Sequence, residues 1–202
     1  MRCSLTSNLR WHGSHISHDH RCQLLRQRPL TIWFTGLSGA GKSTLAFELE
    51  RRLVASGRTA YVLDGDNIRH GLCADLGFSA EARAENIRRV AEVAKLFNDA
   101  GMLSICSLIS PFLSDRALAR RVVGDDRYFE VYVSTPLLEC ERRDVKGLYA
   151  KARAGELENF TGVSMPYEVP IAPNCSVDTS VMSVDEGVDH ILSCLMEHID
   201  LI

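Results

Sequence analysis

The sequence lacks the features that would assign it to a secreted, membrane or nucleic-acid-binding class. No apolar run approaches the ~20 residues that a membrane-spanning helix needs. Residues 1–28 contain no apolar signal-peptide core, so we expect a cytoplasmic protein that does not engage a membrane. The net charge of −3 offers no general basic surface, which argues against nucleic acid as a partner.

Closely spaced cysteine pairs are also missing, although the chain has seven cysteines. Their odd number, wide spacing and lack of a CxxC pair argue against a disulfide framework and against a zinc site. Four histidines lie in the first 20 residues, and a metal-binding tract is one interpretation of them. No cluster of carboxylates or cysteines completes such a site, which favours a loose His-rich tail.

What is present is an ordinary globular composition, with 46 % hydrophobic and 24 % charged residues, in which strand and helix patterns alternate. Apolar, β-branched runs predict strands over residues 30–35, 59–63, 102–109, 129–133 and 175–177. Helical spacing of apolar residues predicts helices over 42–56, 83–100, 116–123, 136–143 and 184–198. This alternation predicts an α/β fold with a parallel sheet of about five strands and helices on both faces.

The length suits one domain over residues 29–202, preceded by an extension over residues 1–28 that has no clear period. Residues 144–174 interrupt the alternation with three prolines, three glycines and several basic and aromatic side chains. A long irregular segment inside a compact domain is usually disordered or functional. We expect this segment to be a lid that closes over a ligand.

The strongest motif follows the first predicted strand and opens the first long helix, and it fits the pattern G-x-x-x-x-G-K-[ST]. Glycines let backbone N–H groups turn toward phosphates, and the helix N-terminus adds partial positive charge. We expect Lys42 to reach the β- and γ-phosphates of ATP and Ser43 to ligate Mg²⁺. The predicted phosphate-binding residues are Gly36, Leu37, Ser38, Gly39, Ala40, Gly41, Lys42, Ser43 and Thr44.

This motif alone indicates a P-loop NTPase fold without choosing the reaction. A guanine-reading N-K-x-D segment is missing, which argues against a GTPase. A small single domain with a basic lid favours a kinase for a nucleoside or a metabolite.

The second predicted strand ends in two carboxylates, Asp64 and Asp66. The carboxyl ends of parallel strands face the ligand crevice. One carboxylate there can orient Mg²⁺, and one can accept a hydrogen bond from the attacking hydroxyl. We assign both roles to Asp64, with Asp66 as the alternative base. The other interpretation is that both carboxylates belong to a solvated Asp-Gly turn without a catalytic role.

Beyond this point the sequence resembles the adenylylsulfate kinase family over residues 11–174. The resemblance depends on ordered blocks: GLSGAGKST at 36–44, DGDNIRHGL at 64–72, GFS at 77–79, RAENIRR at 83–89, ISPF at 109–112, RDVKGLYAKARAGE at 143–156, FTG at 160–162 and PYE at 166–168. Most P-loop kinases share only the first block. The resemblance implies phosphate transfer from ATP to the 3′-hydroxyl of adenosine 5′-phosphosulfate, with Mg²⁺, in sulfate assimilation.

The family also implies which residues bind the substrate. Phe78 and Phe160 would sandwich the adenine, and neither lies on a helical apolar stripe, so we expect neither in the core. Lys146 would meet the sulfate and the transferring phosphate from the lid, and Arg143 would reach the phosphates. The remaining substrate residues implied are Asp66, Asn67, Ile68, Arg69, Arg83, Asn86, Ile109 and Ser110. Ser110 is also a phosphoserine position in some members, and its covalent role stays open.

Two alternatives remain at this stage. A gluconate or shikimate kinase would share the fold but would lack the paired phenylalanines and the DNIR and RAEN blocks. A silent nucleotide-binding regulator would be expected to lack Lys42, Ser43 or the strand-end carboxylates. The family further suggests a homodimer, and it leaves open a functional partnership with ATP sulfurylase.

Overall fold

The computed structural model describes residues 9–10 and 12–200, so Cys3 and residues 1–8 and 11 of the predicted extension lie outside the described residues. Its centre is a five-stranded parallel sheet in the order β2-β3-β1-β4-β5. The strands are β1 (Thr31–Thr35), β2 (Ala60–Asp64), β3 (Leu103–Ser107), β4 (Tyr128–Val133) and β5 (Cys175–Val177). The predicted α/β class and parallel sheet are therefore confirmed.

The helices alternate with the strands, as expected for parallel strands that need crossover connections. They are α1 (His18–Leu25), α2 (Lys42–Ala55), α3 (Ala80–Asp99), α4 (Leu113–Val123), α5 (Leu137–Arg143), α6 (Leu148–Arg153) and α7 (Val184–Ile199), with short 3₁₀ turns η1 (Asn67–His70) and η2 (Asp125–Arg127). Among the described residues, none of these helices combines the length and apolar character needed to cross a membrane.

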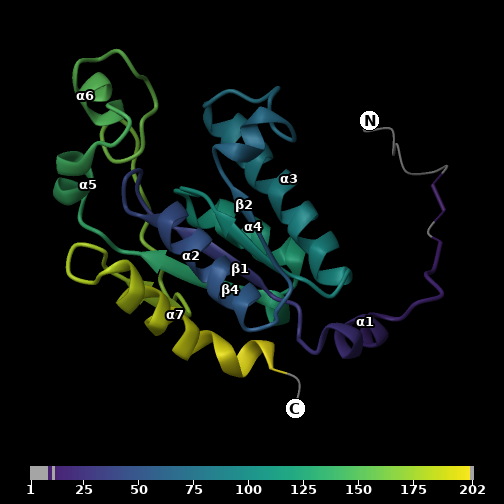
Figure 1. Cartoon of the computed structure of the whole chain (residues 1–202). Coiled ribbons are helices and arrows are strands. Elements are labelled where there is room, and N and C mark those ends of the chain that lie inside the picture. Colours follow the sequence, from purple (N-terminus) through teal and green to yellow (C-terminus); the bar gives the residue numbers. More distant parts are fainter. Residues whose placement is uncertain (1–8, 11, 201–202) are drawn as a thin grey trace.

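Two hydrophobic clusters cover the two faces of the sheet. Alternation along β1 sends Ile32 and Phe34 into the cluster with α2 and α7, and Trp33 into the cluster with α3 and α4. Figure 1 shows the same layers, with α7 below the sheet and α3 and α4 above it. The central position of β1 explains why all five of its residues are buried.

The strand order places the P-loop at a switch point, because β1 pairs with β3 on one side and with β4 on the other. The crossover from β1 leads to β2 on one side of β1, and the crossover from β3 leads to β4 on the other side, which opens a crevice at the carboxyl ends of the strands. The loops after β1, β2 and β3 border this crevice. Figure 1 shows α5 and α6 beyond the same end of the sheet.

Two stretches expected to be irregular contain helices. In the predicted extension, the Ser17 side chain caps α1 by accepting from the His20 amide, and buried Gln27 then donates to the carbonyls of Thr59 and Gly101. In the predicted lid, the two carboxylate oxygens of Asp144 accept from the amides of Tyr149 and Ala150 in α6. Local side-chain caps rather than apolar periodicity stabilise both helices, so the periodic pattern missed them.

Candidate active site

The phosphate-binding loop joins β1 to α2 and depends on glycine at two close approaches. A Cβ at Gly36 would lie 2.6 Å from the Val133 carbonyl oxygen. Gly41, the residue before α2, has a φ of 98°, which L side chains rarely adopt, and a Cβ there would meet the Thr179 side chain at 3.2 Å. The motif therefore forms a tight turn that ends at a helix N-terminus, the geometry that binds phosphate.

Lys42 starts α2 and is buried in this loop, with its side chain only 8 % exposed. Its ammonium donates to the Leu37 carbonyl at 2.7 Å, which holds it across the loop. Burial lowers the pKa of Lys42 to about 8, although the carboxylates of Asp64 and Asp66 oppose that shift. Desolvation outweighs the attraction because the loop excludes water from the ammonium.

Ser43 and Asp64 form a pair of oxygen ligands beside the loop. The Ser43 hydroxyl donates to Asp64 Oδ2 at 2.7 Å and lies 3.3 Å from the Ser107 hydroxyl. Asp64 is buried, and its other oxygen accepts from the amides of Asp66 and Asn67 at 3.0 and 3.4 Å. Hydroxyl and carboxylate oxygens are the ligands that Mg²⁺ takes in nucleotide sites, so this donor set fits the ion.

A second carboxylate, Asp66, lies on the acceptor side and pairs with the lid. Its Oδ2 accepts from the Lys146 ammonium, 80 residues later in the chain. Both side chains are more than half exposed, so this ion pair contributes little to stability. The contact is one that a bound anion could replace.

Two arginines border the exposed ring of Phe78. The Arg69 guanidinium lies 4.4 Å from the ring centroid and donates to the carbonyls of Leu76 and Gly77. Arg83, in the first turn of α3, donates to the carbonyls of Phe78 and Asn159. Each guanidinium has five donors, more than these contacts use, so both can also bind an anion.

Phe160 differs from its predicted partner ring. Phe78 is 63 % exposed, whereas Phe160 is 8 % exposed and belongs to the core cluster. Its ring packs edge-to-face on Tyr149 at 5.0 Å, and the Tyr149 hydroxyl donates to the Ser38 carbonyl of the P-loop. The prediction that Phe160 is outside the core was wrong, because α6 supplies an aromatic wall that the sequence pattern did not show.

The Asn86 side chain is buried, and its Nδ2 has no hydrogen-bond partner among the described residues. Asn86 lines the cavity described below. Since a buried amide without a partner costs free energy, its position at a cavity wall suits a ligand acceptor.

Ser110 is held in an unusual conformation at the end of the loop after β3. It is buried with a φ of 39°, and its hydroxyl accepts from the Trp33 indole at 3.2 Å. Its carbonyl accepts from Arg116 Nη1 at 2.7 Å, while Arg116 Nη2 donates to the Glu168 carbonyl at 2.6 Å. Arg116 thus joins the acceptor segment to the far end of the lid.

Sequence reasoning missed Arg116 as a site residue. It is 3 % exposed and forms an ion pair with buried Glu130 at 3.2 Å. Burial raises the pKa of Glu130, and Arg116 opposes this shift. No pattern around position 116 marks it, because only its tertiary neighbours distinguish it from an exposed helix arginine.

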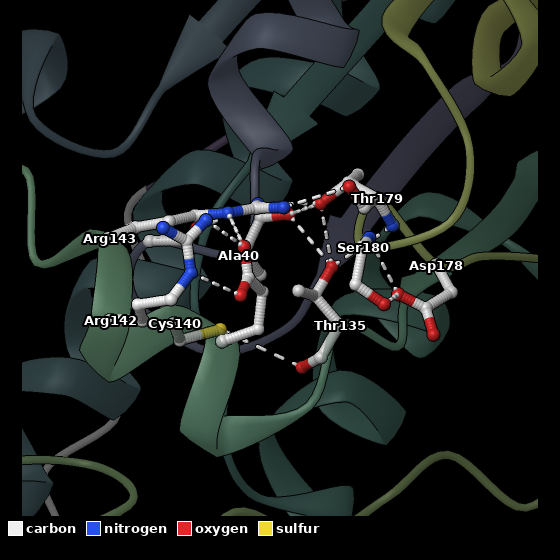
Figure 2. Close-up of polar contacts among 10 residues, drawn as sticks. Ala40, Thr135, Cys140, Arg142, Arg143, Asp178, Thr179 and Ser180 are labelled. Carbon is white, nitrogen blue, oxygen red and sulfur yellow. Dashed lines mark hydrogen bonds and ion pairs between the residues drawn. The ribbon is translucent and has the colours of Figure 1, made fainter.

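Sequence reasoning also missed two threonines that, together with the predicted Arg143, contact the P-loop from the far side (Figure 2). The hydroxyls of Thr179 and Thr135 both donate to the Ala40 carbonyl, at 2.8 and 3.1 Å, and lie 2.8 Å from each other. Arg143 donates to the Thr179 hydroxyl and carbonyl at 2.8 Å each and to Glu139 at 2.9 Å. Arg143 is the last residue of α5 and lies beside the P-loop rather than within the predicted lid. Its guanidinium donates to acceptors of the protein itself in this structure.

These parts surround one cavity of about 540 Å³. The predicted residues that line it are Ser38, Gly39, Gly41, Lys42, Ser43, Thr44, Asp64, Asp66, Arg69, Phe78, Arg83, Asn86, Ile109, Ser110, Arg143, Lys146 and Phe160. The predicted residues outside its lining are Gly36, Leu37, Ala40, Asn67 and Ile68. Ala40 and Gly36 shape the loop instead, and Ile68 packs on the core cluster under α3.

The parallel sheet, the phosphate loop and the cavity at the carboxyl ends of the strands define a P-loop kinase. A sequence profile of the adenylylsulphate kinase family matches residues 28–178. The chain belongs to the adenylylsulphate kinase family, which confirms the resemblance seen in the sequence.

Individual relatives agree. The chain is 56 % identical over 189 residues to the adenylyl-sulfate kinase of Pseudomonas entomophila (strain L48), covering 94 % of this chain and 91 % of that protein. It is 53 % identical over 191 residues to the adenylyl-sulfate kinase of Aeromonas salmonicida (strain A449), covering 95 % and 97 %. The solved structure of the Mycobacterium tuberculosis APS kinase CysC in complex with AMPPNP and APS superposes with a TM-score of 0.81 and 53 % identity, covering 84 % of this chain and 98 % of that chain.

Proposed function

We propose that this protein transfers the γ-phosphate of ATP to the 3′-hydroxyl of adenosine 5′-phosphosulfate. The observation that carries the proposal is one continuous cavity. It joins a phosphate loop to a wall with two arginines, an exposed aromatic ring and a buried amide that has no hydrogen-bond partner among the described residues. A kinase for a small uncharged metabolite would need neither the forked cations nor the flat ring.

On the donor side, the P-loop amides and Lys42 bind the ATP phosphates. Ser43 and Asp64 would hold Mg²⁺, which neutralises charge on the transferring group when it is bound. Asp64 would also orient the acceptor hydroxyl, because it lies at the carboxyl end of β2 beside the P-loop. Catalysis then comes mainly from positioning and charge stabilisation.

On the acceptor side, Arg69 and Arg83 would bind the phosphosulfate, and Phe78 would stack on the adenine. Asn86 would donate its free amide to the nucleotide. Lys146 would exchange its Asp66 partner for the substrate anion, so that binding draws the lid toward the cavity.

Ser110 fits a positioning role in direct transfer. Its hydroxyl is buried against the Trp33 indole, and Arg116 holds its backbone. We expect the intact mass of protein incubated with Mg·ATP to show no added phosphoryl group. A phosphorylated Ser110 in peptide mapping would instead assign it a covalent role.

The reaction is tested by incubating the purified chain with Mg·ATP and a panel of acceptors. ADP release should rise strongly with adenylylsulfate and stay at background with AMP, gluconate and shikimate, and mass spectrometry should identify 3′-phosphoadenylylsulfate. Equal stimulation by AMP would remove the sulfate-specific proposal. Stimulation by none of them, with intact ATP binding, would favour a nucleotide-binding regulator.

Three further predictions stay open. We expect a cytoplasmic location and a homodimer, whose mass light scattering can measure; a functional partnership with ATP sulfurylase stays open. The dimer would be contradicted by a monomer mass at concentrations well above those used for assay.

A further inference from the structure

A cluster of three metal-ligating side chains lies outside the kinase cavity. Cys175 opens β5, and His190 and Cys194 lie on α7. One ligand atom from each residue lies within 4.8 Å of the other two. None of the three lines the kinase cavity, so the reaction does not account for the cluster.

The fold brings these residues together for a structural reason. Residues four apart on a helix are neighbours on its surface, which aligns His190 with Cys194. The buried stripe of α7 includes Ile191 and Leu195, so His190 and Cys194 flank that stripe. Helix α7 packs closely over the edge strand, because a Cβ at Gly187 would lie 3.1 Å from the Val177 side chain.

The chemistry of the set selects a soft or borderline cation. Thiolates and imidazole prefer Zn²⁺ over Mg²⁺, which takes oxygen ligands. Zn–S bonds of about 2.3 Å and Zn–N bonds of about 2.0 Å in a tetrahedron separate the ligand atoms by about 3.4–3.8 Å. The three ligand atoms lie within 4.8 Å of one another, so they need to approach by at most about 1 Å to reach these separations.

We propose that Cys175, His190 and Cys194 form a zinc-class site that joins α7 to the edge strand β5. Cys175 is buried, whereas His190 and Cys194 are not, so the ion has a route in from solvent and a fourth position for water. Within the described residues, no other group of three His, Cys, Asp or Glu ligand atoms comes this close. The wide sequence spacing of the two cysteines hid this proximity.

The chain also supplies a matched control. His18 and Cys22 on α1 repeat the His-x-x-x-Cys spacing, with Cys22 Sγ 3.4 Å from His18 Nε2. This pair has no third ligand in range among the described residues. A weak two-ligand pair and the three-ligand site are therefore present in one protein and can be compared directly.

The test uses the reduced, chelator-treated full chain and Zn²⁺ itself as the probe, titrated in competition with a chromophoric chelator. We expect one zinc ion per chain, a rise in the thermal midpoint on zinc addition, and a thiolate-to-cobalt charge-transfer band when Co²⁺ replaces zinc. Cys194→Ser and His190→Asn should each weaken binding by about 100-fold or more, whereas Cys22→Ser should leave it unchanged. His190→Asn keeps the test valid if the Cys194→Ser variant folds poorly.

Two outcomes overturn the site. Zinc affinity that is the same in Cys194→Ser, His190→Asn and the unchanged chain means that the ion binds elsewhere. A Cys175–Cys194 disulfide in peptide maps, together with no zinc uptake by the reduced protein, assigns the two cysteines to redox chemistry. Neither outcome bears on phosphate transfer, which the acceptor panel tests separately.

Discussion

Lys42 and Asp64 place opposite charges close together at the base of the cavity. Their environments differ: burial lowers the pKa of Lys42, whereas Asp64 accepts from the Ser43 hydroxyl and from two backbone amides. Three donors therefore surround the two carboxylate oxygens of Asp64. Among the described residues the ammonium has one acceptor, the Leu37 carbonyl, so it is the less satisfied of the two charges until ATP phosphates bind.

This imbalance predicts the pH dependence of ATP use. The ratio kcat/KM for ATP reports the free enzyme and should fall above about pH 8, as Lys42 loses its proton. Bound phosphates favour the charged form of the Lys42 ammonium, so kcat should stay constant to a higher pH than kcat/KM does. Lys42→Met should lose at least ~10²-fold in kcat/KM without a fall in thermal midpoint, because the variant no longer buries a charge. Matching pH limits for kcat and kcat/KM would contradict this account of Lys42.

The two carboxylates after β2 should respond differently to the same change. Asp64→Asn keeps the size of the side chain but removes the negative charge from the proposed Mg²⁺ ligand beside Ser43. Turnover should therefore fall by ~10²-fold or more while ATP still binds. Asp66→Asn removes only the exposed partner of Lys146, so it should change mainly the KM for adenylylsulfate. Steady-state kinetics at several Mg²⁺ concentrations separate the two, and collapse in Asp66→Asn alone would reverse the roles.

Connections between elements, more than the elements themselves, determine the shape of the P-loop. The loop from β5 to α7 contributes Thr179, β4 is followed by Thr135, and α5 ends with Arg143 (Figure 2). Thr135 and Thr179 contact the Ala40 carbonyl, and Arg143 contacts the neighbouring Gly39 carbonyl. A phosphate site needs its amides already oriented, and these contacts provide that orientation.

Thr179 is therefore a positioning residue for ATP. Thr179→Val keeps the size but removes the donor to Ala40 and the acceptor for Arg143. At about 0.5–1.5 kcal/mol for each of the two lost hydrogen bonds, or about 1–3 kcal/mol together, the KM for ATP should rise by about one to two orders of magnitude, with little change in the KM for adenylylsulfate. Thr179→Ser should restore most of the affinity. Equal rises in both KM values would indicate a general loss of structure instead.

At the scale of the whole molecule, the cavity has a buried floor, one buried wall and one exposed wall. The floor is the buried sheet edge with the P-loop, and the wall formed by α6 and Phe160 continues the core cluster. The opposite wall, with Phe78 and its two arginines, is exposed. The exposed residues proposed to contact the substrate and the buried core residues therefore lie on different sides of the same cavity.

This asymmetry predicts different outcomes for the two phenylalanines. Phe160→Ala should lower the free energy of unfolding by about 3–5 kcal/mol and weaken both nucleotides, because it opens the core beside Tyr149. Phe78→Ala should leave the thermal midpoint nearly unchanged and weaken adenylylsulfate by about ten-fold, since a stacked base is worth ~1–3 kcal/mol. Thermal unfolding and calorimetric titration with each nucleotide measure both. A normal midpoint in Phe160→Ala would restore the simple adenine sandwich.

Local patterns in the sequence were enough for the strands, the main helices, the P-loop and the carboxylates after β2, because periodicity and glycine placement are properties of neighbouring residues. The family, too, was readable from the ordered blocks. Only the tertiary structure decided that Phe160 is core, that Thr179 and Arg116 hold the site, and that Cys175 meets Cys194. Each of these depends on contacts between residues far apart in the chain, and burial and hydrogen bonding across such distances leave no period or spacing in the sequence.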